Sequence, residues 1–99
     1  MAESVVTQTF VVSAEHGLHL RPAEQLARLA GRYASQIGLV YQSQRVDAKS
    51  IMEMLTLGAS KGASVVVEAR GCDAADAVEA IMALASNDFS SEEDSTSTT

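Results

Sequence analysis

A histidine, an arginine and a proline lie close together in the segment Gly17–Ala23, which reads GLHLRPA. Pro22 has no backbone N–H and is tolerated in a helix only within the first turn, so a helix must begin just before it. His19 therefore lies at or beside the N-cap. The backbone N–H groups of Leu20 and Arg21 then have no acceptor within the helix and lie at the positive end of its dipole. Such a helix start binds anions.

The residue types around His19 suit the transient transfer of a phosphoryl group. Imidazole is a nucleophile, and a useful fraction of it is neutral at cell pH. The guanidinium of Arg21 adds a fixed positive charge whose forked donors match phosphate oxygens. A lone histidine before a helix is usually an ordinary surface residue, but here Gly17, Arg21 and Pro22 would all have to be coincidental as well. The segment predicts a phosphohistidine at His19, with Arg21 and the backbone amides of Leu20 and Arg21 binding the phosphate.

A second helix start follows at Ser50, with Glu53 three residues later. This spacing predicts a capping box, in which Ser50 is the N-cap and the Glu53 side chain reaches back to the N-cap backbone. A serine cap stabilises a helix by about 1 kcal/mol and requires no further role. Further on, Cys72 precedes Asp73, the expected cap of the last helix. We expect Cys72 to be an ordinary loop cysteine, because neighbouring carboxylates oppose thiolate formation.

Hydrophobic periodicity predicts seven elements that must position these residues. Alternating apolar residues indicate strands, and apolar residues recurring every three or four positions indicate helices. In chain order we expect a strand over Val5–Ser13, a helix over Leu20–Tyr33, a strand over Ile37–Tyr41, a short strand at Arg45–Val46, a short helix over Ser50–Leu57, a strand over Val65–Gly71 and a helix from Asp73 to Leu84. This order predicts an α+β domain with helices on one face of a mainly antiparallel sheet.

The 99 residues suffice for one modest core, and their formal net charge is −6. The segment 87–99 carries four acidic residues and no basic one, and it is rich in serine and threonine. It has almost nothing apolar to bury, so we expect a domain over residues 1–86 and a disordered acidic tail over 87–99.

Several function classes are disfavoured by composition. An acidic protein is a poor candidate for nucleic-acid binding, because phosphate contacts supply most of that affinity. No apolar run approaches the ~20 residues of a membrane span, and Met1–Ser4 lacks the basic start of a secretory signal. With the single Cys72, these features predict a cytoplasmic protein. No motif suggests a metal, a nucleotide or another cofactor, and we expect a monomer.

Two segments resemble the signatures of a known family. Gly17–Ala23 is similar to the active-site signature of HPr, the histidine-containing phosphocarrier of the bacterial phosphoenolpyruvate-dependent sugar phosphotransferase system. Asp47–Met52 (DAKSIM) and Thr56–Gly58 (TLG) resemble its second signature at matching spacing, and the likeness covers Val5 to Leu84. It implies an open-faced β-sandwich with four antiparallel strands covered on one face by three helices. It also implies that enzyme I, charged by phosphoenolpyruvate, phosphorylates Nδ1 of His19, which then donates to an enzyme II A domain. Such a carrier is a substrate of phosphotransferases and not itself an enzyme.

The resemblance further implies a docking surface and a regulatory site. Residues of the family that match Ile51, Met52 and Leu55 form an exposed apolar patch beside the histidine, whereas Met54 is expected in the core. Around this patch we expect a basic rim. The expected docking residues beyond these three are Leu20, Arg21, Lys49 and Arg28. In part of the family an HPr kinase/phosphorylase acts on the serine that matches Ser50, so Ser50 is a candidate regulatory phosphorylation site as well as a cap.

Two residues depart from the family pattern, and three alternatives stay open. Leu20 stands where a small residue is usual, and His16 fills a position that often holds a small polar residue; we expect His16 to be an exposed loop residue. Within the carriers, a nitrogen-related regulatory branch competes with the sugar branch. A regulatory module acting by protein binding, for example in catabolite repression, is a second class, against which His19 itself argues. A self-contained phosphatase or kinase is disfavoured, because no general base or nucleotide-binding loop accompanies His19.

Overall fold

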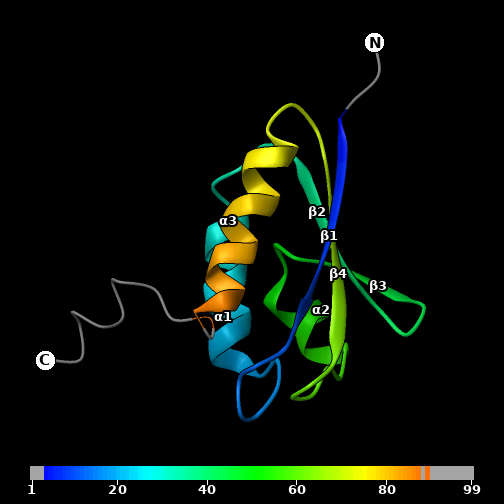
Figure 1. The fold of residues 1–99 in the computed structure, drawn as a ribbon, viewed down its shortest axis with the longest axis vertical. Coiled ribbons are helices and arrows are strands. Elements are labelled where there is room, and N and C mark those ends of the chain that lie inside the picture. Colours follow the sequence, from blue (N-terminus) through cyan, green and yellow to red (C-terminus); the bar gives the residue numbers. More distant parts are fainter. Residues whose placement is uncertain (1–3, 88, 90–99) are drawn as a thin grey trace, which may run out of the picture.

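The computed structural model describes residues 4–87 and 89. In chain order its elements are β1 (Val5–Val11), α1 (Leu20–Ala30), β2 (Gln36–Tyr41), β3 (Gln44–Asp47), α2 (Ile51–Thr56), β4 (Ser64–Arg70) and α3 (Ala74–Ser86). The three helices lie together on one side of the sheet (Figure 1). The predicted α+β class, with a four-stranded antiparallel sheet and three helices, is confirmed.

The strands are ordered β1-β4-β2-β3, and every neighbouring pair is antiparallel. The register places Phe10 opposite Val65, and Leu39 opposite both Val67 and Val46. All five side chains are buried. Because successive strand residues point to opposite faces, one face of each strand supplies the core and the other faces away from the helices.

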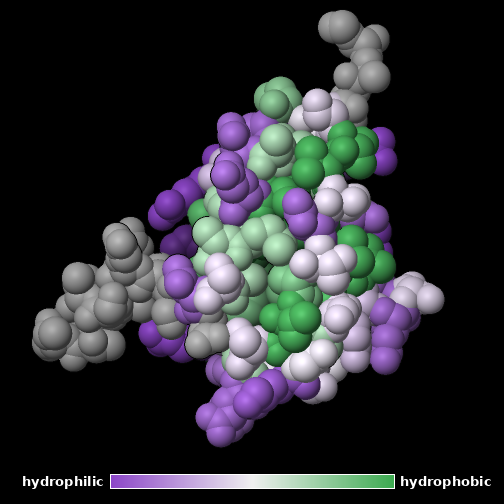
Figure 2. Space-filling view, viewed as in Figure 1, coloured by the Kyte–Doolittle hydropathy of each residue, from purple (hydrophilic) through white to green (hydrophobic). Residues whose placement is uncertain are grey.

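The helices close the core with small and aliphatic side chains. The residues they bury include Ala23, Leu26 and Ala30 from α1, Met54 from α2, and Ala77, Val78 and Ile81 from α3. The space between helices and sheet is therefore filled mainly by aliphatic groups, as the scarcity of aromatic residues requires. On the side formed by α3 and β1, Figure 2 shows apolar residues along the centre and polar residues towards the rim.

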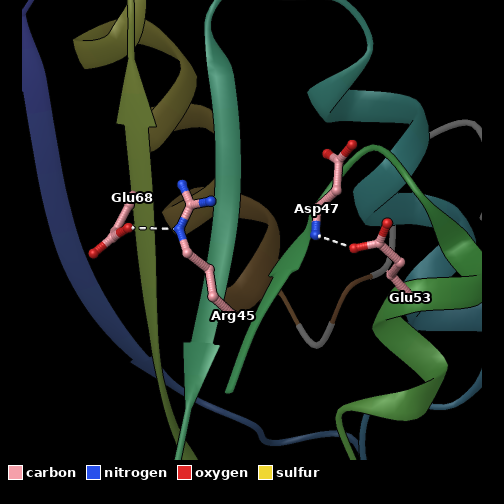
Figure 3. Close-up of polar contacts among 4 residues, drawn as sticks. All are labelled: Arg45, Asp47, Glu53 and Glu68. Atoms are coloured by element: carbon pink, nitrogen blue, oxygen red, sulfur yellow. Dashed lines mark hydrogen bonds and ion pairs between the residues drawn. The ribbon is translucent and has the colours of Figure 1, made fainter. Parts of the chain in front are cut away.

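The face of the sheet opposite the helices carries an ion pair that crosses a strand. Nε of Arg45 on β3 donates to Oε1 of Glu68 on β4 at 3.0 Å, across the intervening β2 (Figure 3). Gly38 of β2 makes this possible, because a Cβ there would lie 2.9 Å from the Arg45 guanidinium carbon. Both side chains are substantially exposed, so this pair contributes little to stability.

Helix α1 ends at Ala30, earlier than the Tyr33 expected from its apolar stripe. Gly31, the C-cap, disfavours continuation of the helix. The chain beyond it is then held by Asp73. The Asp73 carboxylate accepts the backbone N–H groups of Ala34 and Ser35 at 2.9 Å each and also the Ser35 hydroxyl. Asp73 is the N-cap residue of α3 as predicted, but its side chain bonds this distant loop and makes no capping bond to its own helix.

The chain after α3 turns back onto the core. The N–H of Phe89 donates to the carbonyl of Leu84 at 2.8 Å, and the Phe89 ring meets Phe10 edge to face with centroids 5.7 Å apart. Only 2% of Phe89 is exposed. Phe89 belongs to the segment predicted as a tail. Apart from Asn87 and Phe89, that segment lies outside the described residues, so the boundary at residue 86 and the disorder beyond it stay predictions.

Candidate functional site

His19 is the N-cap of α1, in extended conformation with φ −89° and ψ −166°. Its carbonyl accepts the N–H of Ala23 at 3.0 Å, which is the first hydrogen bond of the helix ladder. The helix therefore begins where Pro22 predicts. The amides of Leu20 and Arg21 precede that first bond and lie at the positive end of the helix dipole. The His19 side chain makes no capping hydrogen bond, so its ring is not engaged in holding the helix.

The loop before His19 is held by backbone hydrogen bonds. Gly17 N–H donates to Ala14 C=O, His19 N–H donates to Gly17 C=O, and Leu18 N–H donates to Ala59 C=O, each at 2.9 Å. Figure 1 shows this β1–α1 loop beside the α2–β4 loop, at one end of the molecule.

Two features require glycine at position 17. Its φ is +74°, in the left-handed region that residues with a Cβ avoid. A Cβ would also lie 2.6 Å from the Ala59 carbonyl oxygen and 2.9 Å from Ser60 Cα. Both neighbours are backbone atoms and cannot rotate away. The position of His19 therefore depends on the contact between these two loops.

A hollow beside His19 brings together residues from three regions of the chain. Its lining comprises Ser13, Ala14, Glu15, His19, Arg21, Pro22, Lys61 and Phe89. Arg21 and Lys61 supply positive charge, and Glu15 supplies negative charge. Sequence reasoning missed Lys61 and Phe89, because neither stands near His19 in the chain and no motif marks them. Their proximity depends on how the α2–β4 loop and the end of α3 pack.

The rings of His16 and His19 lie edge to face, with centroids 5.7 Å apart and an interplanar angle of 77°. His16 is exposed, as expected, and His19 is half-buried. The contact between them was not predicted. The only sequence signal was the separation of three residues, which in a loop of unknown conformation does not fix a distance.

The capping box at α2 is only half formed. Ser50 is the N-cap, and its Oγ accepts the Glu53 N–H at 3.3 Å, as predicted. The prediction for the Glu53 side chain is wrong, since its Oε1 accepts the N–H of Asp47 at 2.9 Å (Figure 3). The Ser50 N–H already donates to the Asp47 carbonyl at 3.0 Å, so Glu53 instead satisfies an amide at the end of β3.

The residues expected to dock partners differ in exposure. Leu20, Met52 and Leu55 are 53%, 76% and 39% exposed, on the neighbouring helices α1 and α2. Ile51 is half-buried and packs against the core, while Met54 is fully buried, as expected. Large exposed apolar side chains on adjacent helices suit a partner surface.

The three cations expected around these residues lie at the surface. Arg21, Lys49 and Arg28 are all exposed. Nζ of Lys49 donates to the Tyr33 carbonyl at 2.8 Å, which directs the ammonium group towards the loop after α1. Lys49 therefore also joins the start of α2 to the end of α1.

Neither a metal-ligand cluster nor a membrane-spanning helix occurs among the described residues. Across residues 4–87 and 89, no group of three or more histidine, cysteine, aspartate or glutamate side chains is placed to hold a metal ion. In the same residues, no helix combines the length and the apolar character that crossing a membrane would need.

The fold and the helix-capping histidine together are those of a small phosphoryl-carrier domain. Residues 6–87 match the family model described as the PTS HPr component phosphorylation site. The chain belongs to the HPr family of the phosphotransferase system, whose members are phosphocarriers and not catalysts. The recognition drawn from the two sequence signatures is thereby confirmed.

Solved structures agree with this assignment. HPr-C-His from Thermoanaerobacter tengcongensis is 34% identical, with 88% of this chain and 98% of that chain covered and a TM-score of 0.83. The phosphocarrier protein HPr from Bacillus anthracis is 32% identical, with 83% and 98% covered and a TM-score of 0.78. Crh, a catabolite repression protein of Bacillus subtilis that was solved as a swapped dimer, is 32% identical over 87% and 99%, with a TM-score of 0.69.

Proposed function

We propose that His19 accepts a phosphoryl group from phosphoenolpyruvate-charged enzyme I and passes it to enzyme II A domains in sugar uptake, in the cytoplasm. The observation that carries this proposal is the position of His19 as the N-cap of α1, with its side chain outside the capping bonds. The nucleophile and the anion-binding end of the helix thus occupy one place.

The chemistry requires little beyond positioning. Nδ1 of the neutral imidazole attacks the phosphorus of the donor phosphohistidine, and the bond from phosphorus to the donor nitrogen breaks as the new one forms. The equatorial oxygens carry the charge of the transition state, and the amides of Leu20 and Arg21 with the Arg21 guanidinium stabilise that charge. Lys61, which lines the same hollow, adds positive charge near this site. The reverse steps release the group to the next acceptor.

The exposed apolar residues Leu20, Met52 and Leu55 supply the docking surface, with the half-buried Ile51 beneath it. Lys49, Arg28 and Arg21 are the cations of its rim. An apolar centre with a basic rim favours acidic partners and fast encounter. A carrier must also leave each partner quickly, and a small interface serves that need.

Ser50 offers a point of regulation by an HPr kinase/phosphorylase. Its Oγ accepts the Glu53 N–H at 3.3 Å, and the residue is half-buried beside the exposed Met52. A phosphate there would add about two negative charges to the docking surface and repel the acidic partners that the rim attracts. Phosphorylation of Ser50 is therefore expected to slow transfer from enzyme I without altering His19.

A labelling experiment tests the assignment of the acceptor. The protein is incubated with enzyme I and phosphoenolpyruvate, and intact mass reports phosphorylation. We expect an acid-labile, base-stable phosphate on the wild type that is lost in His19→Ala. The chain has two histidines, so His16→Ala is the matched control and should still carry the label. An unlabelled wild type, with the same enzyme I active on another carrier, would refute the proposal.

A regulatory module is the second candidate, favoured by the likeness to Crh. It predicts binding to partner proteins controlled by Ser50, with no phosphoryl transfer through His19. The nitrogen-related branch is a further variant that keeps the transfer but changes the acceptor. Offering the phosphorylated protein to enzyme II A domains of the sugar and nitrogen types separates the branches by which acceptor becomes labelled.

A further inference from the structure

We propose that His16 is a positioning residue for the phosphorylated site: it takes up a proton when His19 carries the phosphoryl group and holds that group as an imidazolium. The proposal rests on His19 being the acceptor. It adds a second histidine to the site and makes the phosphorylated state depend on pH.

The two rings are close enough to interact. Their centroids lie 5.7 Å apart, and the 77° angle directs the edge of one ring to the face of the other. A phosphoryl group on His19 introduces about two negative charges beside the His16 ring. Charges at such separations interact appreciably even when exposed to water.

The loop between the rings is rigid enough to keep them together. His16 lies in the turn closed by the hydrogen bond from Gly17 N–H to Ala14 C=O. Gly17 itself is held against the backbone of Ala59 and Ser60. The contact therefore does not depend on a freely moving loop, and the entropy lost on forming the ion pair is small.

Charged groups that line the hollow on His19 also act on a phosphoryl group there. Glu15 comes from the same loop, Arg21 from α1 and Lys61 from the α2–β4 loop. Guanidinium and ammonium groups carry a fixed positive charge near neutral pH, whereas an imidazole can gain or lose its charge between pH about 5 and about 8. Among the described residues that line the hollow or contact the His19 ring, His16 is the imidazole that can respond in this way.

Proton uptake and phosphorylation must then favour one another. The proton comes from solvent, and no covalent bond to His16 forms or breaks. By linkage, the phosphorylated form is stabilised where His16 can be protonated, and this stabilisation is lost as the pH rises and the ring becomes neutral. The His16 ring therefore makes phosphoryl transfer to this protein more favourable in mildly acidic than in alkaline solution, compared with a protein that lacks the ring.

A competition experiment measures this effect free of the pH dependence of enzyme I. Equal amounts of wild type and His16→Phe are mixed with a catalytic amount of enzyme I and a limiting amount of phosphoenolpyruvate. Intact mass then gives the equilibrium partition of phosphate between the two proteins. Phenylalanine keeps a ring in place and cannot accept a proton. We expect the partition to favour the wild type about three- to tenfold more at pH about 6 than at pH about 8.

NMR provides the second measurement. At pH about 7, phosphorylation should shift the His16 ring protons towards the positions that they reach in acid. When His16→Asn, which lacks the ring, competes with the wild type in place of His16→Phe, the preference for the wild type should again be larger at the lower pH. If the ratio of phosphorylated wild type to phosphorylated variant stayed constant between the two pH values, the proposal would be overturned. Absence of phosphate on every protein would instead refute His19 as the acceptor, so the two failures are distinguishable.

Discussion

At the residue scale, Arg21 is the side chain whose geometry matters most after His19. A guanidinium binds phosphate oxygens in a fork, whereas an ammonium is a point charge. We predict that Arg21→Lys lowers kcat/KM for phosphorylation by enzyme I about tenfold, and that Arg21→Ala lowers it more. The measurement is the rate of phosphate gain at several carrier concentrations. Arg28→Lys, which keeps charge at the expected rim, is the matched control. Equal rates for Arg21→Lys and wild type would show that charge alone suffices.

Gly17 and Gly58 form a matched pair for testing the loop that holds His19. Both have positive φ, +74° and +72°, but a Cβ at Gly17 meets the Ala59 and Ser60 backbone, while a Cβ at Gly58 meets nothing within 4 Å. We predict that Gly58→Ala lowers the free energy of unfolding by about 1 kcal/mol and Gly17→Ala by about 2–4 kcal/mol. Urea denaturation measures both. Similar losses would mean that the two loops separate easily.

The sequence was most informative where a residue acts on its own backbone. Pro22 fixes the start of α1, because its missing N–H restricts it to the first turn. Ser50 caps α2 by accepting the N–H of Glu53, three residues further along the chain. It was least informative where two loops meet. Lys61 and Phe89 reach the hollow beside His19, and His16 meets His19, through packing that no local pattern encodes. Glu53 shows the same limit, since its choice of partner depends on whether the Ser50 N–H is already bonded.

At the element scale, Asp73 joins the start of α3 to the loop between α1 and β2. The hydrogen bond from the Ser35 hydroxyl is the main cause that lowers the pKa of the Asp73 carboxyl, followed by the one from the Ala34 amide. A carboxyl with a lowered pKa in the folded state contributes stability above its unfolded pKa, near 3.8, and loses it as the pH falls through the folded value.

We therefore predict that Asp73→Asn reduces stability at neutral pH and flattens its decline in acid. The thermal midpoint, followed from pH about 7 down to pH about 2, should fall less steeply for the variant than for the wild type. Asp76→Asn, in the first turn of the same helix, controls for the loss of one negative charge. Parallel curves for Asp73→Asn and wild type would show that the loop contacts do not depend on the charge.

At the scale of the whole molecule, a residue beyond the last helix packs back against the first strand. Phe89 is buried against Phe10 of β1 and also lines the hollow beside His19, so it connects the sheet, the end of α3 and the candidate site. Its φ of +62° is unfavourable for a bulky side chain. Burial of the ring and the hydrogen bond from the Phe89 N–H to the Leu84 carbonyl together offset this strain.

The last prediction follows from that balance. Phe89→Ala removes the ring but keeps a Cβ at positive φ, so we expect the free energy of unfolding to fall by about 3–4 kcal/mol. Phe89→Gly also loses the ring but relieves the strain, and it should be the more stable variant by about 1 kcal/mol. Val5→Ala, an exposed change on the strand that carries Phe10, should cost less than about 1 kcal/mol. Urea denaturation ranks the three. If Phe89→Ala were as stable as Val5→Ala, the Phe89 ring would not contribute to the stability of the domain. Its packing against Phe10 would then not explain why Phe89 lines the hollow beside His19.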